Sequence, residues 1–514
     1  MKKELNTIYE EGQKALFSFI PGQDILGLAF HGQKPYHKKK TIHWIKGDGR
    51  NLNIMGIVLA AGQGKRMKSK LYKVLHQVCG KPMVDHVVTA LENIQASRTV
   101  VVVGHGAEAV QAYLGDRVEY ALQEQQLGTG HAVLQAKDLL AAEDGLTIVI
   151  YGDTPLISDS TLEGMIKLHQ EKGAAATLLT AVVDDPTGYG RIIRDERGHV
   201  TQIVEQKDCN EAQRLVKETN VGTYCFDNRK LFEALALVKN DNAQNEYYIT
   251  DVIGILVGQG QIVEGYVLED EAESFGVNDR LQLSVAEQTM RERINRRHML
   301  AGVTMIDPAS TYIEADVQIG ADTILLPGTV IQGKTVIGED CVIGPQADIT
   351  DSTIGSGVTV KHSVLQEAVV GDGSSVGPYA YLRPGADLGQ NVKIGDFVEI
   401  KNAKLADDVK VSHLSYVGDA VIGRNVNFGC GAITVNYDGF NKQLTEVEED
   451  AFIGSNVNLV APVKIGKGAY VVAGSTITHE VRDGDVAIAR ERQVNKHGYA
   501  DKLRTKFAAK KANK

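Results

Sequence analysis

Hydrophobic and polar residues follow two different rhythms along the chain, and the change falls near residue 302. Between residues 55 and 280, short apolar runs such as GIVLAA (56–61) and TVVVVG (99–104) alternate with amphipathic stretches such as MVDHVVTALENI (83–94). Apolar runs bounded by glycine are typical of strands buried on both faces, and amphipathic stretches are typical of helices that cover them. We therefore expect an α/β domain with a Rossmann-like, mostly parallel sheet over residues 55–280.

Beyond residue 302 an aliphatic residue recurs at every sixth position, over three stretches of the chain. A helix cannot keep a six-residue step, whereas a short strand followed by a corner can, with one aliphatic side chain turned inward per strand. Three hexads close one triangular coil, and stacked coils predict a parallel β-helix over residues 303–489. The inward positions are Ile313, Ile319, Leu325, Ile331, Ile337, Ile343, Ile349, Val376, Leu382, Leu388, Ile394, Ile400, Ile453, Leu459, Ile465, Val471 and Ile477.

Three further segments complete the predicted organisation. Residues 281–302 carry apolar positions at helical spacing among many charges, which suits a linker helix between the two domains. Residues 490–514 are basic, and we expect a loosely ordered, solvated tail. Residues 1–54 form an extension in which we find no chemistry. Because residues 47–50 (GDGR) can be encoded by a purine-rich stretch just before an ATG, we expect Met55 to be the natural start.

Charge and cysteine content narrow the classes of partner. The formal net charge of −10 gives no support for nucleic acid or an anionic membrane as the main partner. An anionic ligand must then be met by a local cluster of cations. No apolar run approaches about 18 residues, so we expect no membrane span. The 5 cysteines are scattered without a CxxC pair, which favours free thiols in a reducing cytoplasm.

The stretch LAAGQGKRM (59–67) leaves the first predicted strand as a turn of small residues followed by cations. Small residues let backbone N–H groups approach an anion closely, and the cations add charge. Together with LYKVLHQVCGKPM (71–83), the turn resembles the signature of sugar-1-phosphate nucleotidyltransferases. The resemblance implies that Lys73 contacts a phosphate. Tyr72 stands where that family usually has proline, which we expect to loosen the loop. The nucleotide contacts implied in the turn are Leu59, Ala60, Gly62, Gly64 and Arg66.

Two further motifs of this domain point to base recognition and to a metal ion. LQEQQLGTGHA (122–132) resembles the uracil-recognising segment of uridylyltransferases, which implies Gln123, Gly128 and Thr129 as contacts. A glutamine amide offers one donor and one acceptor, the pattern needed to pair with an imide edge. Asp153 follows a buried strand, and the carboxyl edge of an open α/β sheet is where ligands bind. An aspartate there suits Mg²⁺, and the resemblance implies Asn278 as the second metal ligand.

The segments PTGYGRI (186–192), IVEQKD (203–208) and TNVGTY (219–224) resemble the sugar-binding segments of one particular family. That family is the bifunctional bacterial N-acetylglucosamine-1-phosphate uridyltransferase/glucosamine-1-phosphate N-acetyltransferase. The resemblance covers about residues 55–490 and implies that the β-helix is left-handed. The implied contacts to the N-acetylated sugar are Gly190, Glu205 and Asn220.

A second site is expected in the β-helix, where VSHLSYVGD (411–419) and VNYDG (435–439) interrupt the hexads. Acetyl transfer to an amine needs a base, and histidine is suited because its ordinary pKa is about 6.5. His413 has the richest polar setting of the β-helix histidines and matches the family's catalytic base. His362 and His479 lack such company and are expected to be surface residues.

The same resemblance supplies the remaining residues of the second site. The resemblance implies that Arg383 and Lys401 hold the sugar phosphate. The implied contacts to the sugar are Tyr416, Asn427 and Asn436. The implied contacts to acetyl-coenzyme A are Cys430, Asn436, Tyr437, Ser455, Ala473 and Arg490. Cys430 stands where the family often has alanine, so we expect sensitivity to thiol reagents.

The resemblance implies a homotrimer with two active sites, and the free thiols favour the cytoplasm. One would acetylate glucosamine-1-phosphate from acetyl-CoA. The other would transfer UMP from UTP to N-acetylglucosamine-1-phosphate with Mg²⁺, releasing pyrophosphate and UDP-N-acetylglucosamine. Three alternatives stay open: a non-catalytic regulatory subunit, a single-function nucleotidyltransferase with a purely oligomerising β-helix, and a solenoid related to γ-class carbonic anhydrases. The last would need a set of zinc-binding histidines, and the repeats carry no HxxxxH pair.

Overall fold

The computed structural model describes residues 51–512 of the chain. The extension of residues 1–54, on which the expected start at Met55 depends, lies almost wholly outside the described residues. The first domain is a 9-stranded, mostly parallel sheet in the order β11-β7-β10-β6-β1-β4-β5, with β8 and β9 paired beside β10. Strand β10 runs antiparallel to β6, β7 and β8, and β8 and β9 also pair antiparallel. The strands are β1 (Ile54–Ala60), β4 (Arg98–Val103), β5 (Glu119–Leu122), β6 (Leu146–Tyr151), β7 (Ala176–Val182), β8 (Arg191–Arg194), β9 (Val200–Val204), β10 (Glu218–Asp227) and β11 (Val263–Val267).

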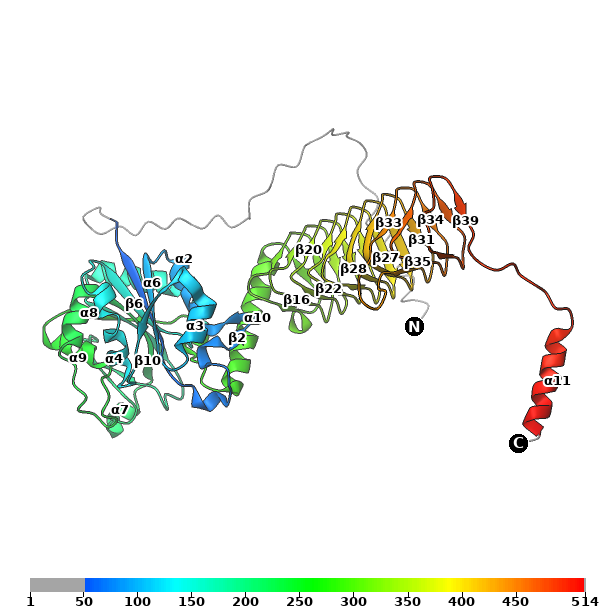
Figure 1. Cartoon of the computed structure of the whole chain (residues 1–514). Helices are drawn as coiled ribbons and strands as arrows, with labels where there is room; N and C mark the ends of the chain where they lie inside the picture. The colour runs from blue at the N-terminus through cyan, green and yellow to red at the C-terminus, as the bar shows by residue number, and fades with distance from the viewer. Residues whose placement is uncertain (1–50, 513–514) are drawn as a thin grey trace, which may run out of the picture. The chain divides into compact units, whose positions relative to one another are not determined.

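Helices cover both faces of this sheet, as the continuous apolar runs predict (Figure 1). One core joins the sheet to α2, α3 and α6, and the other joins it to α4, α5, α8 and α9. Strand β1 feeds both cores, with Val58 on one face and Ile57 on the other. The helices are α2 (Met83–Asn93), α3 (Ala107–Leu114), α4 (Thr129–Leu134), α5 (Lys137–Leu140), α6 (Asp159–Lys172), α7 (Glu211–Arg214), α8 (Asn228–Leu235) and α9 (Asp251–Gly258), and a small hairpin is formed by β2 (Gln77–Val78) and β3 (Lys81–Pro82).

Residues 280–300 form the single helix α10 (Arg280–Leu300), in the segment where the pattern predicts a linker. Its N-terminus is capped by Asp279, whose carboxylate accepts the backbone N–H of Gln282 at 2.9 Å. Near the other end of the chain, Tyr499–Ala512 form helix α11, in which no residue is buried. The expectation of a loosely ordered tail is therefore wrong for this part, because alanine, lysine and arginine are strong helix formers.

Beyond α10 the chain forms a parallel β-helix, and the hexad analysis is confirmed (Figure 1). From β12 to β25 each strand pairs with the third strand further along, so Ile313 lies against Ile331 and Ile331 against Ile349. Further along the chain some strands are longer, and β27 pairs with β29. The hexad aliphatics fill its core; all are buried except Ile319, which is half-buried. The six-residue step breaks where coils are shorter: Ile349 pairs with Leu365, only 16 positions on.

The strands of the β-helix lie in two hydrogen-bonded sheets. The first sheet contains β12 (Thr304–Met305), β15 (Ile324–Leu325), β18 (Val342–Ile343), β21 (Thr359–Val360), β24 (Ser375–Val376), β27 (Lys393–Asp396), β29 (Lys410–His413), β31 (Asn427–Phe428), β34 (Phe452–Ile453), β37 (Tyr470–Val471) and β39 (Val486–Ala487). The second contains β13 (Tyr312–Ile313), β14 (Gln318–Ile319), β16 (Val330–Gln332), β17 (Val336–Ile337), β19 (Asp348–Thr350), β20 (Thr353–Ile354), β22 (Val364–Gln366), β23 (Val369–Val370), β25 (Tyr381–Leu382), β26 (Ala386–Leu388), β28 (Glu399–Leu405), β30 (Tyr416–Ile422), β32 (Ile433–Val435), β33 (Thr445–Val447), β35 (Asn458–Val460), β36 (Val463–Ile465) and β38 (Thr476–Ile477).

Candidate active sites

The glycine-rich turn follows β1 at the carboxyl edge of the sheet. Gly64 has φ +61°, and a Cβ there would lie 2.4 Å from the Cβ of Lys73. Only glycine therefore lets the turn pack against the segment that carries this lysine. Tyr72, where proline was expected, donates its hydroxyl to the carbonyl oxygen of Ala60 at 2.8 Å. Its backbone also has φ −63°, the angle that proline would impose, so the substitution ties the loop rather than loosening it.

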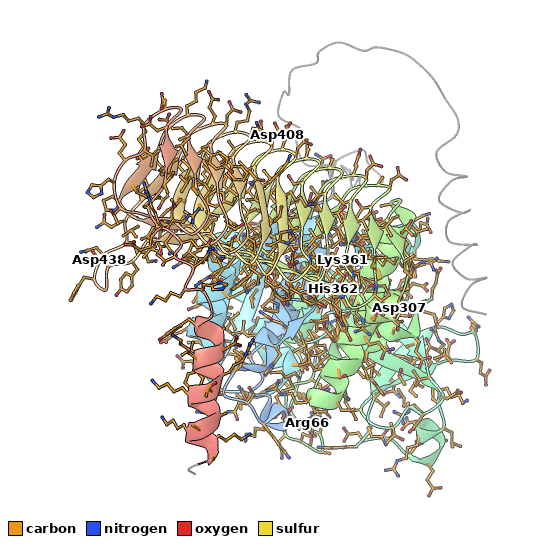
Figure 2. The ribbon with its side chains drawn as sticks, turned by 90° about the vertical axis from the view of Figure 1, so that its right-hand side faces the viewer. Arg66, Asp307, Lys361, His362, Asp408 and Asp438 are labelled. Carbon is orange, nitrogen blue, oxygen red and sulfur yellow. The ribbon has the colours of Figure 1, made fainter. Side chains whose placement is uncertain are left out.

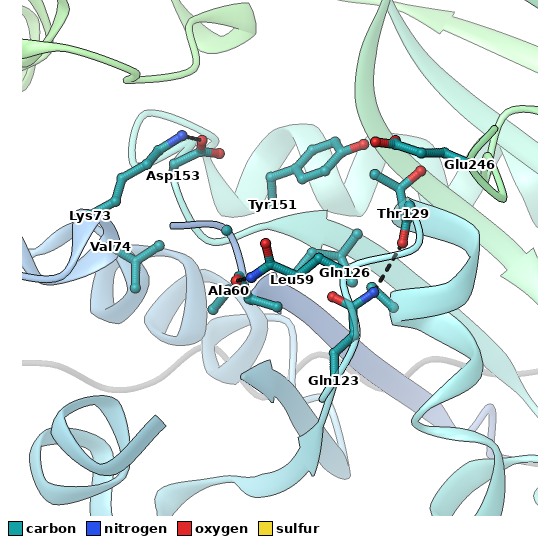
Figure 3. Close-up of a pocket in the computed structure, with 14 residues that line it drawn as sticks. Leu59, Ala60, Lys73, Val74, Gln123, Gln126, Thr129, Tyr151, Asp153 and Glu246 are labelled. Carbon is teal, nitrogen blue, oxygen red and sulfur yellow. Dashed lines mark hydrogen bonds and ion pairs between the residues drawn. The ribbon is translucent and has the colours of Figure 1, made fainter. Parts of the chain in front are cut away.

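A cavity of about 300 Å³ lies beside this turn (Figure 3). Eight residues implied by the sequence line it, although they come from four separate segments: Leu59, Ala60, Gly62, Lys73, Gln123, Gly128, Thr129 and Asp153. Parallel strands bring their carboxyl ends to one edge, which is why segments so distant in sequence meet here.

Lys73 lies between the two oxygen groups expected to bind a metal. Its ammonium forms an ion pair with Asp153 (Figure 3). Its Nζ also donates to Oδ1 of Asn278 at 2.9 Å. The side chains of Lys73 and Asp153 are only 13% and 19% exposed, so the pair is largely withdrawn from water. The side-chain oxygens of Asp153 and Asn278 thus both contact the ammonium of Lys73 and lie close to each other. Two oxygen ligands fit Mg²⁺, which takes few protein ligands and completes its shell with water and substrate phosphates.

The orientation of Gln123 differs from the expectation of one donor and one acceptor facing the ligand. Its Nε2 donates to the carbonyl oxygen of Gly128 at 3.1 Å and lies 3.1 Å from Nδ1 of His131. The side chain is 4% exposed, and the amide nitrogen is used within the protein. The atom left for a ligand is Oε1, an acceptor, so Gln123 fits an N–H on the base edge.

The three expected sugar contacts also lie together. The backbone N–H of Asn220 donates to the carbonyl oxygen of Gly190 at 2.9 Å, and a Cβ on Gly190 would be 3.6 Å from Oε1 of Glu205. Burial raises the pKa of Glu205. Burial, followed by the charges of Glu205 and Asp153, also raises the pKa of the cavity-lining Tyr151, which links the sugar residues to the metal side of the cavity.

Two predicted residues of the turn lie elsewhere. Gly64 lines a second hollow of about 520 Å³, together with Lys65, Lys68 and Lys70. Arg66 is exposed and lines neither cavity (Figure 2). The second hollow is basic and begins where the first ends, at the glycine-rich turn, which suits the outer phosphates of a nucleoside triphosphate.

The cavity also contains residues that the sequence did not reveal. Tyr151, Gln126 and Glu246 line it beside the expected residues (Figure 3). Gln126 donates from Nε2 to the carbonyl oxygen of Ala61 at 2.6 Å, which holds the loop of residues 123–128 against the glycine-rich turn. For Tyr151 a signal existed, since it is the last residue of the strand that precedes Asp153.

In the β-helix, His413 ends strand β29 and is 57% exposed. Its Nδ1 lies 2.5 Å from Oδ1 of Asp396, which ends β27 in the preceding coil. The hydrogen bond to His413 lowers the pKa of Asp396 below its ordinary value. The other histidines differ: His479 is exposed, as expected, whereas His362 is half-buried, with its ring tilted against that of Tyr379 at a centroid distance of 5.5 Å. Of the three, His413 is the histidine that the structure pairs with a carboxylate.

Two of the expected phosphate contacts lie in a group of cations. The ammonium of Lys442 lowers the pKa of Lys401, and Arg383 adds to the same effect. Arg383 is paired with Glu399 at 2.7 Å, and the charge of Asp419 opposes the effect of Lys442 on Lys401. The repulsion between the ammonium groups of Lys401 and Lys442 would be relieved by a bound anion. Lys442 was missed by the sequence analysis because it lies in the loop of residues 436–444, outside any repeat. This loop projects from the β-helix at Asp438 (Figure 2).

The loop begins with a buried polar network. Nδ2 of Asn436 donates to Oδ2 of Asp419 at 2.5 Å and lies 3.3 Å from the hydroxyl of Tyr416. The other carboxylate oxygen of Asp419 accepts from Asn402 at 2.6 Å. The neighbouring Tyr437 is 59% exposed. This network fixes where the loop leaves the β-helix and connects two expected contacts, Asn436 and Tyr416.

The remaining expected coenzyme residues stack along one corner of the β-helix. The backbone N–H of Asn456 donates to the carbonyl oxygen of Cys430 at 2.8 Å, and that of Gly474 to Ser455 at 2.8 Å. Ala473 precedes Gly474, and the side chain of Arg490 follows at the next coil, 3.6 Å from a Cβ built on Gly474. His413 starts this column, because its carbonyl oxygen accepts from Gly431 at 3.2 Å. Asn427 lies one coil above Lys410, on β31.

The structure also bears on the expectations of free thiols, of a zinc solenoid and of a membrane span. All 5 cysteines are free, and Cys430 is the exposed one. Within residues 51–512 we find no group of three or more histidine, cysteine or acidic side chains arranged to hold a metal ion. None of the helices described here is both long enough and apolar enough to cross a bilayer.

Comparison with known proteins identifies the family of both domains. A nucleotidyl transferase model matches residues 55–274, and a bacterial transferase hexapeptide model matches residues 367–402 and 445–479. The fold is thus a nucleotidyltransferase domain joined to a left-handed parallel β-helix of hexapeptide repeats. The bifunctional protein GlmU of Brevibacillus brevis is 60% identical over 450 residues, which are 88% of this chain and 98% of that protein. GlmU of Bacillus subtilis is 58% identical over 450 residues, 88% of this chain and 99% of that protein. The chain belongs to the GlmU family of bifunctional proteins.

Proposed function

We propose that the chain makes UDP-N-acetylglucosamine in two steps at two separate sites. The β-helix acetylates glucosamine-1-phosphate from acetyl-CoA. The α/β domain then transfers UMP from UTP to N-acetylglucosamine-1-phosphate and releases pyrophosphate. The observation that carries this proposal is the presence of two anion-handling clusters, one around Lys73 and one around Lys401, with His413 and its carboxylate partner in the same β-helix as the second.

In the acetyl transfer, His413 is the base. As the amine nitrogen attacks the thioester carbonyl, Nε2 of His413 takes a proton from it, the N–C bond forms, and the C–S bond breaks to release coenzyme A. Arg383, Lys401 and Lys442 bind the phosphate of the amino sugar. This role explains why three cations stand together on the β-helix.

The corner column that begins at His413 suits an extended coenzyme. On the coils that precede it, this corner carries the large exposed side chains Tyr379, Phe397 and Leu414. On the coils that follow, the corresponding positions are Gly431, Asn456 and Gly474. The change from bulky to small residues leaves a track beside the histidine, along which Cys430, Ser455, Ala473 and Arg490 would contact acetyl-CoA.

In the uridylyl transfer, a phosphate oxygen of the sugar attacks the α-phosphorus of UTP and displaces pyrophosphate. Lys73 neutralises charge on the phosphates, and Oε1 of Gln123 accepts the imide N–H of uracil. Gly190, Glu205 and Asn220 bind the N-acetylated sugar. A Mg²⁺ ion bound by Asp153 and Asn278 would supply further charge neutralisation at the phosphates.

We also propose that the protein is a homotrimer that works in the cytoplasm, where acetyl-CoA and UTP are available. The exposed corner of Tyr379, Phe397 and Leu414 supports an assembly through the β-helix, because Tyr379 and Phe397 stack at 5.4 Å and form a continuous apolar ridge. Phe397→Asp should shift the mass measured by light scattering from trimer to monomer if this ridge is the interface.

The competing function is a nucleotidyltransferase whose β-helix only assembles the protein. That function would leave the His413–Asp396 pair, the three cations and the 436–444 loop without a role. Product analysis decides between the two. Purified protein is given glucosamine-1-phosphate, acetyl-CoA, UTP and Mg²⁺, and each component is left out in turn. UDP-N-acetylglucosamine should require all of them, and N-acetylglucosamine-1-phosphate should accumulate without UTP. Formation of UDP-sugar only from supplied N-acetylglucosamine-1-phosphate would favour the competing function.

A further inference from the structure

Asp396 is the acidic residue that the structure brings to the ring of His413. The two residues are 17 positions apart and come into register because β27 pairs with β29. The backbone reinforces this register, since the N–H of Leu414 donates to the carbonyl oxygen of Asp396 at 2.9 Å. Gly395 permits the close approach, because a Cβ there would lie 1.9 Å from the carbonyl oxygen of Ser412. The contact is therefore built into the coil.

Among the charged side chains on the strands that neighbour His413, Asp396 is the carboxylate paired with its ring. Strand β27 carries Lys393 and Asp396, and β29 carries Lys410 and His413. Lys393 and Lys410 are in register with each other, and each lies three residues before the pair of Asp396 and His413. The next strand, Asn427–Phe428, carries no charge. On the adjoining face of the coil, Glu399 is paired with NH1 of Arg383 at 2.7 Å.

The contact decides which nitrogen of the ring can act as a base. An ionised carboxylate only accepts hydrogen bonds, and the hydrogen bond to His413 holds the pKa of Asp396 below its ordinary value. At neutral pH the proton of a neutral His413 ring must then lie on Nδ1, facing Oδ1 of Asp396. The lone pair is left on Nε2, the nitrogen that points away from the carboxylate.

We propose that Asp396 is a positioning residue for acetyl transfer: it fixes the tautomer and the orientation of His413 and stabilises the imidazolium that forms when Nε2 takes the amine proton. This inference rests on the proposed role of His413 as the base. Asp396 does not itself take the proton. The role matches that of the carboxylate in other base-orienting pairs, but here both side chains are partly exposed, so the effect is smaller.

The test compares single and double variants of the full chain, with acetyl transfer measured by release of the coenzyme thiol. In Asp396→Asn, the amide can donate to Nδ1 and so favours the wrong tautomer. The expected result is a fall in kcat of about 10- to 100-fold, with KM for glucosamine-1-phosphate and acetyl-CoA within about twofold of the original. Uridylyl transfer by the same preparation should be unchanged. Asp396→Glu should recover part of kcat.

Two further variants show whether Asp396 acts through His413. The double variant His413→Ala/Asp396→Asn should be no slower than His413→Ala alone, because a positioning residue has no effect once the positioned group is gone. The matched control is Glu449→Gln, which removes an exposed carboxylate paired with Lys467 on the same β-helix and should leave kcat unchanged. Thermal unfolding of each variant reports whether it is folded.

The outcomes separate this inference from the proposed function. If His413→Ala keeps acetyl transfer, the proposed base is wrong. If His413→Ala abolishes the activity while Asp396→Asn loses less than twofold, only the positioning role is wrong. A rise in KM for glucosamine-1-phosphate at constant kcat would instead assign Asp396 to substrate contact and overturn the proposal. So would a double variant slower than His413→Ala alone. If Asp396→Asn is unfolded, Asp396→Glu decides: full loss of kcat in a folded Asp396→Glu overturns the proposal.

Discussion

The two sites gather their residues in opposite ways. In the α/β domain, Lys73 and Asn278 touch across 205 positions of sequence. In the β-helix, Asp396 and His413 touch across 17. Loops at a sheet edge converge only when the whole sheet is formed, whereas a solenoid brings residues together through the pairing of neighbouring coils. The first site is thus a property of the entire domain, and the second is a property of a few coils.

The largest expected effects come from substitutions that remove a chemical group from only one of the two sites. Asp153→Asn should reduce uridylyl transfer at least about a hundredfold, because it removes a charged ligand from the phosphate site, and should leave acetyl transfer intact. His413→Ala should do the reverse. Both activities are measured on each purified variant. Equal loss of both activities in either variant would mean that the two clusters do not serve separate reactions.

The sequence predicted the fold well, because both rhythms follow directly from burial. Apolar runs such as residues 56–61 could only be strands covered on both faces, and the hexads demanded one inward side chain per short strand. The pattern failed between residues 350 and 375, where the coils lose one or two residues at their corners and Ile349 meets Leu365. When a corner is one or two residues shorter, the inward positions that follow it shift, and a count of every sixth residue misses them.

The candidate sites were predictable only where a motif carried them. Lys442 escaped because the loop that carries it obeys no repeat, and Glu246 because its cavity forms only in the folded domain. The orientation of Gln123 is also set by tertiary contacts, to Gly128 and His131. Asp396 is different. The coil length of 17 or 18 residues, counted back from His413, points to this position, so the repeat itself held the signal.

Removing the metal should separate the sites without any mutation. Adding excess EDTA should abolish uridylyl transfer and leave acetyl transfer within about twofold, because the proposed acetyl chemistry uses only His413 and cationic side chains. Titrating Mg²⁺ back should restore the first activity. If acetyl transfer also failed with EDTA and recovered with Mg²⁺, the two sites would not differ in their need for a metal ion.

The β-helix core offers a test of coil-by-coil stability. Ile331 is fully buried and Ile319 is half-buried, although both occupy the inward hexad position. Ile331→Ala should destabilise the β-helix by about 2–5 kcal/mol, because it leaves a cavity in a packed core. Ile319→Ala should cost roughly 1 kcal/mol, since part of its surface already meets water. Chemical unfolding followed by circular dichroism measures both, and equal costs would contradict the assigned packing.

A single methyl group added beside Tyr151 should affect the proposed sugar site of the first cavity. Gly222 has φ +86°, and a Cβ there would lie 2.2 Å from the ring of Tyr151. Gly198 has φ +85° but open space around it, so it serves as the matched control. Gly198→Ala should cost about 1–2 kcal/mol from backbone strain alone. Gly222→Ala should cost about 1–3 kcal/mol more and raise KM for N-acetylglucosamine-1-phosphate, because Tyr151 must move. Identical behaviour of the two variants would show that Tyr151 yields freely.

The smallest expected effect concerns the hydroxyl of Tyr72, which ties the segment that carries Lys73 to the end of strand β1. Burial raises the pKa of Tyr72 to about 12, so its hydroxyl stays protonated and continues to donate to Ala60 across the ordinary pH range. Tyr72→Phe should cost about 0.5–1.5 kcal/mol and lower uridylyl transfer only a few-fold, since the backbone of the loop keeps its conformation. Tyr72→Pro should be tolerated similarly, because φ is already −63° and proline replaces the lost tie with a rigid ring. Uridylyl transfer and thermal unfolding measured on both variants, with acetyl transfer as the internal reference, check this. A loss of uridylyl transfer in Tyr72→Phe as large as that in Asp153→Asn would mean that the hydroxyl acts on the substrate rather than on the loop.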